Sequence, residues 1–206
     1  MSEKDNYKDT FNEENAKFVS ILNNKGMFHL SISSGAVVPI TNPKYYEGRK
    51  HIVLDKDLEN NYVSRQEVEI EKDKYKYNVD EPVIDEVIEY TKTNLNRLLE
   101  IAINQSMEMY DGVSHIINIK MGSIYLTLSP LNAKAEADSL FLNDFEKKII
   151  EILTYPRCPI CGRKLNYMMP DGATLCCNNC NKYFINDSGK VGQETTYPYT
   201  NPNADY

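Results

Sequence analysis

The residues best suited to chemistry are the five cysteines, all of which lie between residues 157 and 184. Four of them form two C-x-x-C pairs that are separated by fifteen residues. Each pair is typical of a tight turn that points two sulfur atoms at a common centre, so the two pairs offer four thiolates to one tetrahedral metal ion. The spacing therefore predicts a metal site formed by Cys158, Cys161, Cys177 and Cys180.

This ligand set favours structural zinc, because four sulfur ligands leave no coordination position open for a substrate. The same four thiolates can also hold iron. A disulfide framework is the rival to any metal. The chain begins Met-Ser-Glu-Lys-Asp without an apolar run, which is not typical of a secretory signal. We therefore expect a reducing cytoplasm, that of a bacterial host, where disulfides are rare.

The fifth cysteine, Cys176, fits the metal site poorly. Its spacing to Cys180 is C-x-x-x-C, which does not match the turn of the first pair. On a strand its side chain would also point to the face opposite that of Cys177. We expect Cys176 to lie outside the metal site, as a small buried hydrophobic side chain rather than a reactive thiol.

The residues between the two pairs predict a hairpin, with strands over 164–169 and 173–177 and a turn over 170–172. The first knuckle, Cys158 to Gly162, reads C-P-x-C-G and resembles the zinc ribbons of transcription and translation proteins. The second knuckle departs from that pattern, because Asn181 stands where a glycine is common. The resemblance covers about thirty residues and implies a bound metal and a contact module.

Catalytic motifs are missing from the rest of the sequence. We find no phosphate-binding glycine loop, no nucleophile elbow and no H-E-x-x-H. The three histidines, His29, His51 and His115, each fall in an expected strand, and none has a partner at ligand spacing. His51 and Asp55 can share a strand face and form a surface hydrogen bond. We expect no enzyme; the alternative is a site assembled in three dimensions from one of these histidines and nearby carboxylates.

Charge is divided unevenly along the chain. The 206 residues carry a formal net charge of −7, which argues against binding of the whole chain to a phosphate backbone. The cysteine-rich segment has the opposite sign, since residues 157–184 hold four basic side chains against Asp171. These four, Arg157, Arg163, Lys164 and Lys182, are candidates for a nucleic-acid contact, and a merely solvated surface is the alternative.

The periodicity of the remaining chain predicts an α+β fold, in which an antiparallel sheet packs on a long helix and a small C-terminal zinc ribbon follows. We expect helices from Thr10 to Gly26, from Pro82 to Tyr110 and after a cap at Asp144. Strands are expected over 28–33, 36–40, 51–54, 62–71, 113–120 and 123–129, with a turn at 34–35 and a loop over 130–139. The expected domains are a flexible N-terminus (1–9), an α+β body (10–155), the ribbon (156–185) and a disordered tail (186–206).

The composition is rich in Asn, Lys, Ile, Glu, Asp and Tyr and contains no Trp, as an AT-rich bacterial or phage genome would produce. In size, acidity, composition and lack of catalytic motifs, the chain resembles staphylococcal bacteriophage proteins that bind the host sigma factor. The resemblance implies binding to the promoter-recognising region of sigma within RNA polymerase and inhibition of transcription from some promoters. The alternative is a zinc-ribbon accessory protein that binds DNA or RNA. No membrane partner is expected, because no apolar run approaches the roughly 20 residues of a membrane helix.

Overall fold

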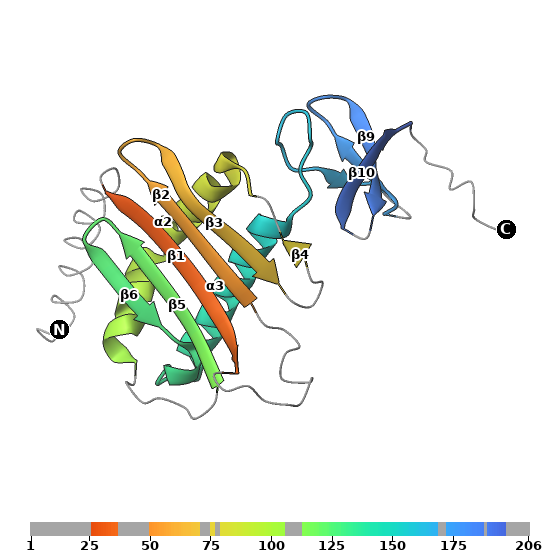
Figure 1. Ribbon diagram of the computed structural model, residues 1–206. Coiled ribbons are helices and arrows are strands. Elements are labelled where there is room, and N and C mark those ends of the chain that lie inside the picture. The colour runs from red at the N-terminus through yellow and green to blue at the C-terminus, as the bar shows by residue number, and fades with distance from the viewer. Residues whose placement is uncertain are drawn as a thin grey trace, which may run out of the picture. The chain divides into compact units, whose positions relative to one another are not determined.

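The structure of the protein is a computed structural model, and it describes residues 26–36, 50–70, 75–76, 79–105, 113–168, 172–187 and 189–196. The chain separates into two compact units, Met1–Leu153 and Thr154–Tyr206, called here the body and the ribbon module (Figure 1). The helix expected from Thr10 lies outside the described residues, as do the expected strand over 36–40 beyond Ala36 and residues 197–206.

The body is built on a six-stranded antiparallel sheet with the strand order β4-β3-β2-β1-β5-β6. Two helices cover one face of this sheet (Figure 1), so the predicted α+β class is confirmed. The strands are β1 (Met27–Ala36), β2 (Lys50–Asp57), β3 (Tyr62–Ile70), β4 (Tyr75–Lys76), β5 (Val113–Met121) and β6 (Ile124–Leu128). The helices are α2 (Glu81–Asn104) and α3 (Glu136–Thr154), and a short 3-10 helix, η2 (Pro130–Asn132), precedes α3.

Alternation along the strands decides which face of the sheet the helices cover. In β1, Phe28, Leu30 and Ile32 are fully buried, whereas His29 and Ser31 between them are half-buried. Side chains two apart share a face, so the apolar set meets the helices and the polar set points the other way. No helix covers that polar face in the described part of the chain (Figure 1).

The long helix forms where the sequence predicts it and ends earlier. Asp80 occupies the N-cap position, a proline lies in the first turn, and a buried apolar stripe faces the sheet. The helix has 24 residues, about 36 Å at 1.5 Å per residue, and stops at Asn104 rather than Tyr110. The reason lies at Gln105, whose side-chain amide donates to the Thr127 carbonyl (2.5 Å) and accepts from the Ser129 N–H (3.2 Å).

Two other predicted boundaries are wrong. The expected turn at residues 34–35 is part of a continuous β1, because Ser34 lies opposite Lys50 of β2 and His115 of β5. Pairing on both sides satisfies the backbone without a turn. The expected loop over 130–139 contains η2 and the start of α3 at Glu136, so Asp144 lies inside this helix and does not cap it.

The ribbon module holds a four-stranded antiparallel sheet with the order β10-β9-β8-β7. Its strands are β7 (Asn166–Tyr167), β8 (Thr174–Cys177), β9 (Lys182–Asp187) and β10 (Lys190–Thr195). The last strand corrects the prediction of a disordered tail from residue 186. A turn closed by the Gly189 N–H on the Asn186 side-chain oxygen (2.9 Å) brings β10 back along β9, and Val191 packs on the module core.

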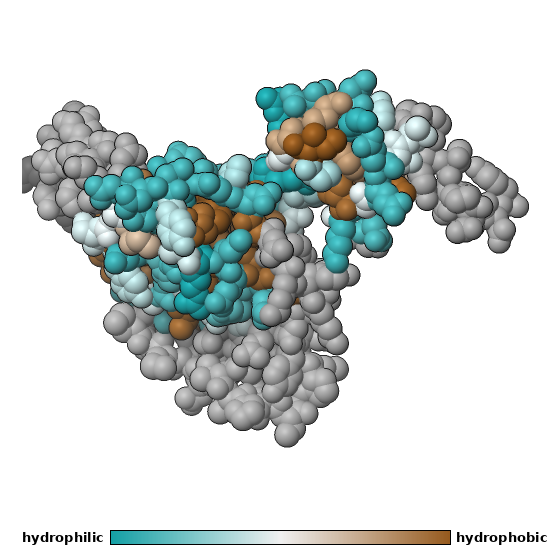
Figure 2. All heavy atoms as spheres, turned by 45° about the horizontal axis from the view of Figure 1, so that its top comes forward, coloured by the Kyte–Doolittle hydropathy of each residue, from teal (hydrophilic) through white to brown (hydrophobic). Residues whose placement is uncertain are grey.

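The two units show similar hydropathy on the face drawn in Figure 2. In the view of Figure 2, hydrophilic residues cover much of the visible described surface of both, interrupted by smaller hydrophobic areas. Neither α2 nor α3 combines the length and apolar character that a membrane crossing requires, and this holds for every helix in the described part of the chain.

Candidate metal centre

The four predicted cysteine ligands meet at one point in the ribbon module. The sulfur atoms of Cys158, Cys161, Cys177 and Cys180 all lie within 4.8 Å of one another. Across the two pairs, the Sγ atoms of Cys158 and Cys180 are 3.9 Å apart and those of Cys161 and Cys177 are 3.5 Å apart. A tetrahedral site with zinc–sulfur bonds of about 2.3 Å places its sulfurs about 3.8 Å apart. The four residues are therefore positioned to bind one metal ion, and their geometry fits zinc.

Backbone hydrogen bonds hold the first knuckle in shape. The Cys158 N–H donates to the Arg163 carbonyl and the Gly162 N–H donates to the Cys158 carbonyl, both at 2.8 Å. Gly162 has φ +70°, in the left-handed region that glycine occupies without strain. In the second knuckle, Cys177 ends β8 and lies opposite Lys182 at the start of β9. The sheet therefore sets the spacing of the second sulfur pair.

The thiols of this group differ in how readily they ionise. A hydrogen bond from the Arg163 backbone N–H lowers the pKa of Cys161 to about 6. A hydrogen bond between the Cys180 and Cys161 side chains raises the pKa of Cys180 to about 12. Burial raises the pKa of Cys158. One thiolate forms readily and then discourages ionisation of its neighbours, because like charges this close repel. A divalent metal removes that repulsion and releases the protons, as thiolate ligation requires.

The metal ligands are also part of the module core. Among the described residues of the module, five form a buried core, and two of these are predicted ligands: Cys158, Leu165, Leu175, Cys177 and Phe184. Such a small apolar cluster supplies little stability by itself, and domains of this size commonly depend on a metal. Four protein ligands around one point are compatible with a structural zinc site.

Cys176 lies outside the four-sulfur group, as predicted. It is buried, with 7% of its surface exposed, and its thiol contacts the side-chain oxygen of Asn178 at 3.4 Å. Burial raises the pKa of this thiol, which keeps it protonated and weakly nucleophilic.

The four basic residues proposed for a nucleic-acid contact have different surroundings in the structure. Lys182 forms a 2.5 Å ion pair with Glu194 of β10, the strand that the sequence did not predict. Arg157 is half-buried and its backbone bridges to that of Lys164. Arg163, Lys164 and Lys182 are exposed, and the first two lie on the segment that leads into β7.

Sequence reasoning missed an aromatic pair beside these two residues. The ring of Tyr167 meets that of Tyr155 edge to face, with centroids 6.5 Å apart, and 44% of Tyr167 is exposed. The Lys164 ammonium lies 5.5 Å from the centre of the Tyr155 ring, within cation–π range. Lys164 and the two rings are therefore in contact, and the exposed Arg163 precedes Lys164 in the chain. These four residues are called here the β7 strip: Tyr155, Arg163, Lys164 and Tyr167.

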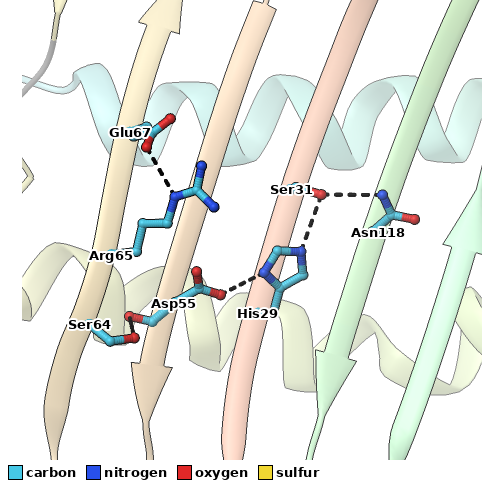
Figure 3. Close-up of polar contacts among 7 residues, drawn as sticks. All are labelled: His29, Ser31, Asp55, Ser64, Arg65, Glu67 and Asn118. Atoms are coloured by element: carbon cyan, nitrogen blue, oxygen red, sulfur yellow. Dashed lines mark hydrogen bonds and ion pairs between the residues drawn. The ribbon is translucent and has the colours of Figure 1, made fainter.

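In the body, two histidines face a carboxylate on the polar side of the sheet. The Nδ1 atom of His29 lies 2.6 Å from Oδ1 of Asp55 (Figure 3), and Nε2 of His51 lies 3.2 Å from Oε2 of Glu67. The predicted pairing of His51 with Asp55 is wrong, because β1 runs beside β2 and places His29 directly opposite Asp55. A contact between residues 26 positions apart leaves no local signal in the sequence.

The third histidine, His115, lies on the helix side of the sheet and hydrogen-bonds to Glu146 of α3. Lys50 binds the same carboxylate from β2 at 2.5 Å. Burial opposes ionisation of Glu146, yet its hydrogen bonds to His115 and Lys50 outweigh burial and lower the pKa below its usual value of 4.5. The charged Glu146 carboxylate is therefore held by hydrogen bonds from both β2 and β5, the two strands that flank β1.

Comparison with known protein families, with curated proteins and with solved structures finds no match for this chain. The assignment of function therefore depends on the residues and geometry described above.

Proposed function

We propose that this chain is a regulatory binding protein of the phage type, which binds the host RNA polymerase sigma factor in the bacterial cytoplasm and inhibits transcription from some promoters. The supporting observation is the separation of charge between the units. The ribbon module carries five Lys and Arg against four Asp and Glu, a net charge of +1, which leaves −8 for the body. Sigma factors read DNA with basic surfaces, and an acidic body is attracted to such surfaces.

Exposed carboxylates offer two places on the body for this contact. On the polar face of the sheet, β3 presents Glu67 and Glu69. On the helical side, Glu81, Asp85 and Glu89 are exposed at intervals of one turn along α2. The α2 set is partly neutralised, because buried Lys56 binds Glu81 and Asp85. Glu67 also forms ion pairs, with Arg65 and His51, but these are exposed, whereas the α2 carboxylates hold the buried Lys56. The β3 pair is therefore the better site for testing recognition without disturbing the fold.

In this proposal the ribbon module is a contact element that folds around one structural zinc ion. Cys158, Cys161, Cys177 and Cys180 would hold the ion, which contributes folding energy and no reaction step. A second candidate function is direct contact with single-stranded DNA or RNA through the β7 strip. It is favoured by the exposed Tyr167 beside Lys164 and Arg163, since aromatic stacking and positive charge together bind single strands.

The test is a pull-down with the tagged full-length protein from a lysate of a low-GC bacterium, with and without nuclease and at two salt concentrations. Recovery of sigma and polymerase that persists after nuclease treatment is the expected result. Loss of both on nuclease treatment, with a steep dependence on salt, would favour the nucleic-acid function instead. Recovery of neither overturns the sigma proposal.

Two matched double variants separate the candidates. E67Q/E69Q removes charge from the β3 face, and R163Q/K164Q removes charge from the β7 strip; all four side chains are exposed, so the fold should tolerate both. The sigma proposal expects weaker sigma recovery with the first variant and little change with the second. The reverse pattern, together with weaker binding of a fluorescent oligonucleotide by the second variant, assigns the function to the ribbon module.

A further inference from the structure

Polar side chains form a hydrogen-bonded row on the open face of the body sheet; Figure 3 shows it from Asp55 of β2 to Asn118 of β5, and Thr127 of β6 continues it. Asp55 of β2 contacts Nδ1 of His29 at 2.6 Å, and Nε2 of the same ring contacts the Ser31 hydroxyl at 3.3 Å. The amide of Asn118 on β5 donates to that hydroxyl at 3.2 Å, and Thr127 of β6 donates to the Asn118 side-chain oxygen at 2.9 Å.

An ionised Asp55 only accepts, so the Nδ1 atom of His29 that faces it carries a proton. In the neutral form of the ring with this tautomer, Nε2 presents a lone pair. Thr127 occupies the oxygen of Asn118, which turns the Asn118 NH₂ group toward Ser31. The Ser31 oxygen therefore accepts from Asn118, which leaves its own hydrogen available to Nε2 of His29, 3.3 Å away.

We propose that Ser31 is a nucleophilic serine that accepts the acyl group of activated carboxylic esters, with His29 as its general base and Asp55 as the residue that positions the ring. The Ser31 oxygen would form a bond to the ester carbonyl carbon as its proton moves to Nε2 of His29. Collapse of the tetrahedral intermediate breaks the bond to the alkoxy group, which leaves as an alcohol with the proton from His29. Water can then hydrolyse the acyl-serine by the same proton path, returning the free hydroxyl and a carboxylic acid.

The fold holds this arrangement rigidly and leaves it accessible. His29 and Ser31 are two residues apart on β1 and so share a face, while the strand register places Asp55 opposite His29. Strand β1 is paired on both sides, with β2 and β5. The His29 side chain is 28% exposed and that of Asp55 20%. Ser31 is itself half-buried rather than buried, so the proposal requires a small ester to approach from this open face.

The same strand supplies a matched control. Ser33 lies two residues beyond Ser31, on the same face, and is exposed. It too has a histidine directly opposite, His51 of β2. However, Nε2 of His51 is engaged by Glu67. The two serines thus share strand, face and a neighbouring imidazole, and differ in the hydrogen bond that would activate the hydroxyl.

Labelling of the zinc-loaded full-length protein with a fluorophosphonate probe, followed by peptide mapping, tests the proposal. We expect one adduct, on Ser31, that S31A abolishes and S33A leaves unchanged. H29Q should slow labelling by at least about 100-fold, the lower range of general-base effects. D55N should slow it as well and D55E should restore it, with unchanged melting temperatures. Labelling at another residue, or at Ser31 with the same rate in H29Q, overturns the proposal.

A second pair of variants keeps the test independent of serine probes and of the proposed sigma contact. In S31C the thiol takes the place of the hydroxyl, and we expect iodoacetamide to modify it at least ten times faster than the thiol of S33C. The H29Q change should remove this advantage. Equal rates in S31C and S33C would show that Ser31 belongs to an inert hydrogen-bond network. A burst of p-nitrophenolate from p-nitrophenyl acetate in the wild type, lost in S31A, supports acyl transfer; its absence counts against it.

Discussion

Gly162 and Asn181 occupy the same left-handed backbone conformation, with φ of +70° and +51°. Each directly follows the second cysteine of its pair, Cys161 in the first knuckle and Cys180 in the second. Asparagine is among the few residues other than glycine that adopt this conformation readily. The departure from the glycine pattern at Asn181 therefore leaves the two knuckles with matching geometry.

Substitution at Asn181 tests this relationship. N181G should leave zinc affinity and stability nearly unchanged, because glycine accepts a positive φ without strain. N181V should destabilise the ribbon module by about 1–2 kcal/mol, since a β-branched side chain is strained there. Thermal unfolding of the module, followed by release of zinc to a colorimetric chelator, measures both. Equal stability of the two variants would show that a positive φ at residue 181 has no free-energy cost for a β-branched side chain.

The metal site predicts a stoichiometry. Elemental analysis of the purified full-length protein should give one zinc per chain, and less than half an equivalent of metal would end the four-cysteine interpretation. C161S should unfold the ribbon module and leave the body folded, because the metal supplies the folding energy of the module. C176S is the matched control and should retain zinc. Two-dimensional amide NMR spectra distinguish loss of one unit from loss of both.

Glu146 gives the body a specific response to acid. Its folded-state pKa is lowered, so its stabilising contribution is complete above the unfolded value near 4.5 and is lost as the pH falls through the lower folded value. E146Q should cost about 3 kcal/mol at pH 7, since it leaves Lys50 and His115 without their buried partner. The difference from wild type should shrink below pH 4.5. Urea unfolding at several pH values gives the comparison.

A control for that experiment lies on the same helix. Glu151 is exposed and pairs with Lys148 at 2.8 Å. E151Q should change the free energy of unfolding by no more than about 0.5 kcal/mol, with no special dependence on acid. If E146Q and E151Q behave alike, the buried carboxylate does not stabilise the body.

Because β10 pairs with β9, we expect the C-terminal segment to stabilise the ribbon module. A chain that stops after Asp187 loses the β9–β10 pairing, the packing of Val191 and the Lys182–Glu194 ion pair. We expect it to melt several degrees lower and to release zinc faster than the full chain. A chain that stops after Thr196 keeps all three contacts and should match the full-length protein. Identical behaviour of both truncations would contradict a structural role for β10.

Features encoded by neighbouring residues were predictable from the sequence. The two cysteine pairs are each closed by a turn, the alternation of Val68 and Ile70 with charged residues marks β3, and the apolar stripe of α2 follows from 3.6-residue spacing. The buried and exposed positions of β3 confirm that interpretation.

Features that depend on distant partners were not predictable. Ser34 reads as a turn residue until β2 and β5 are known to pair with it. The contact of His29 with Asp55 depends on strand register, and the end of α2 at Asn104 depends on a side chain reaching β6. The β10 segment is polar, and its order comes from a single turn and a few contacts with β9. Each needs a strand pairing that local periodicity does not specify.

The bonds from Gln105 to Thr127 and Ser129 also bear on how copies of this protein behave at high concentration. Strand β6 is at the end of the described sheet order, and an edge strand with open N–H and C=O groups is a template for intermolecular strand addition. Here a side-chain amide mimics the next peptide group and occupies one carbonyl and one N–H of that edge. An incoming strand would have to displace Gln105 first. We therefore expect the residue that ends the helix also to oppose strand addition at this edge.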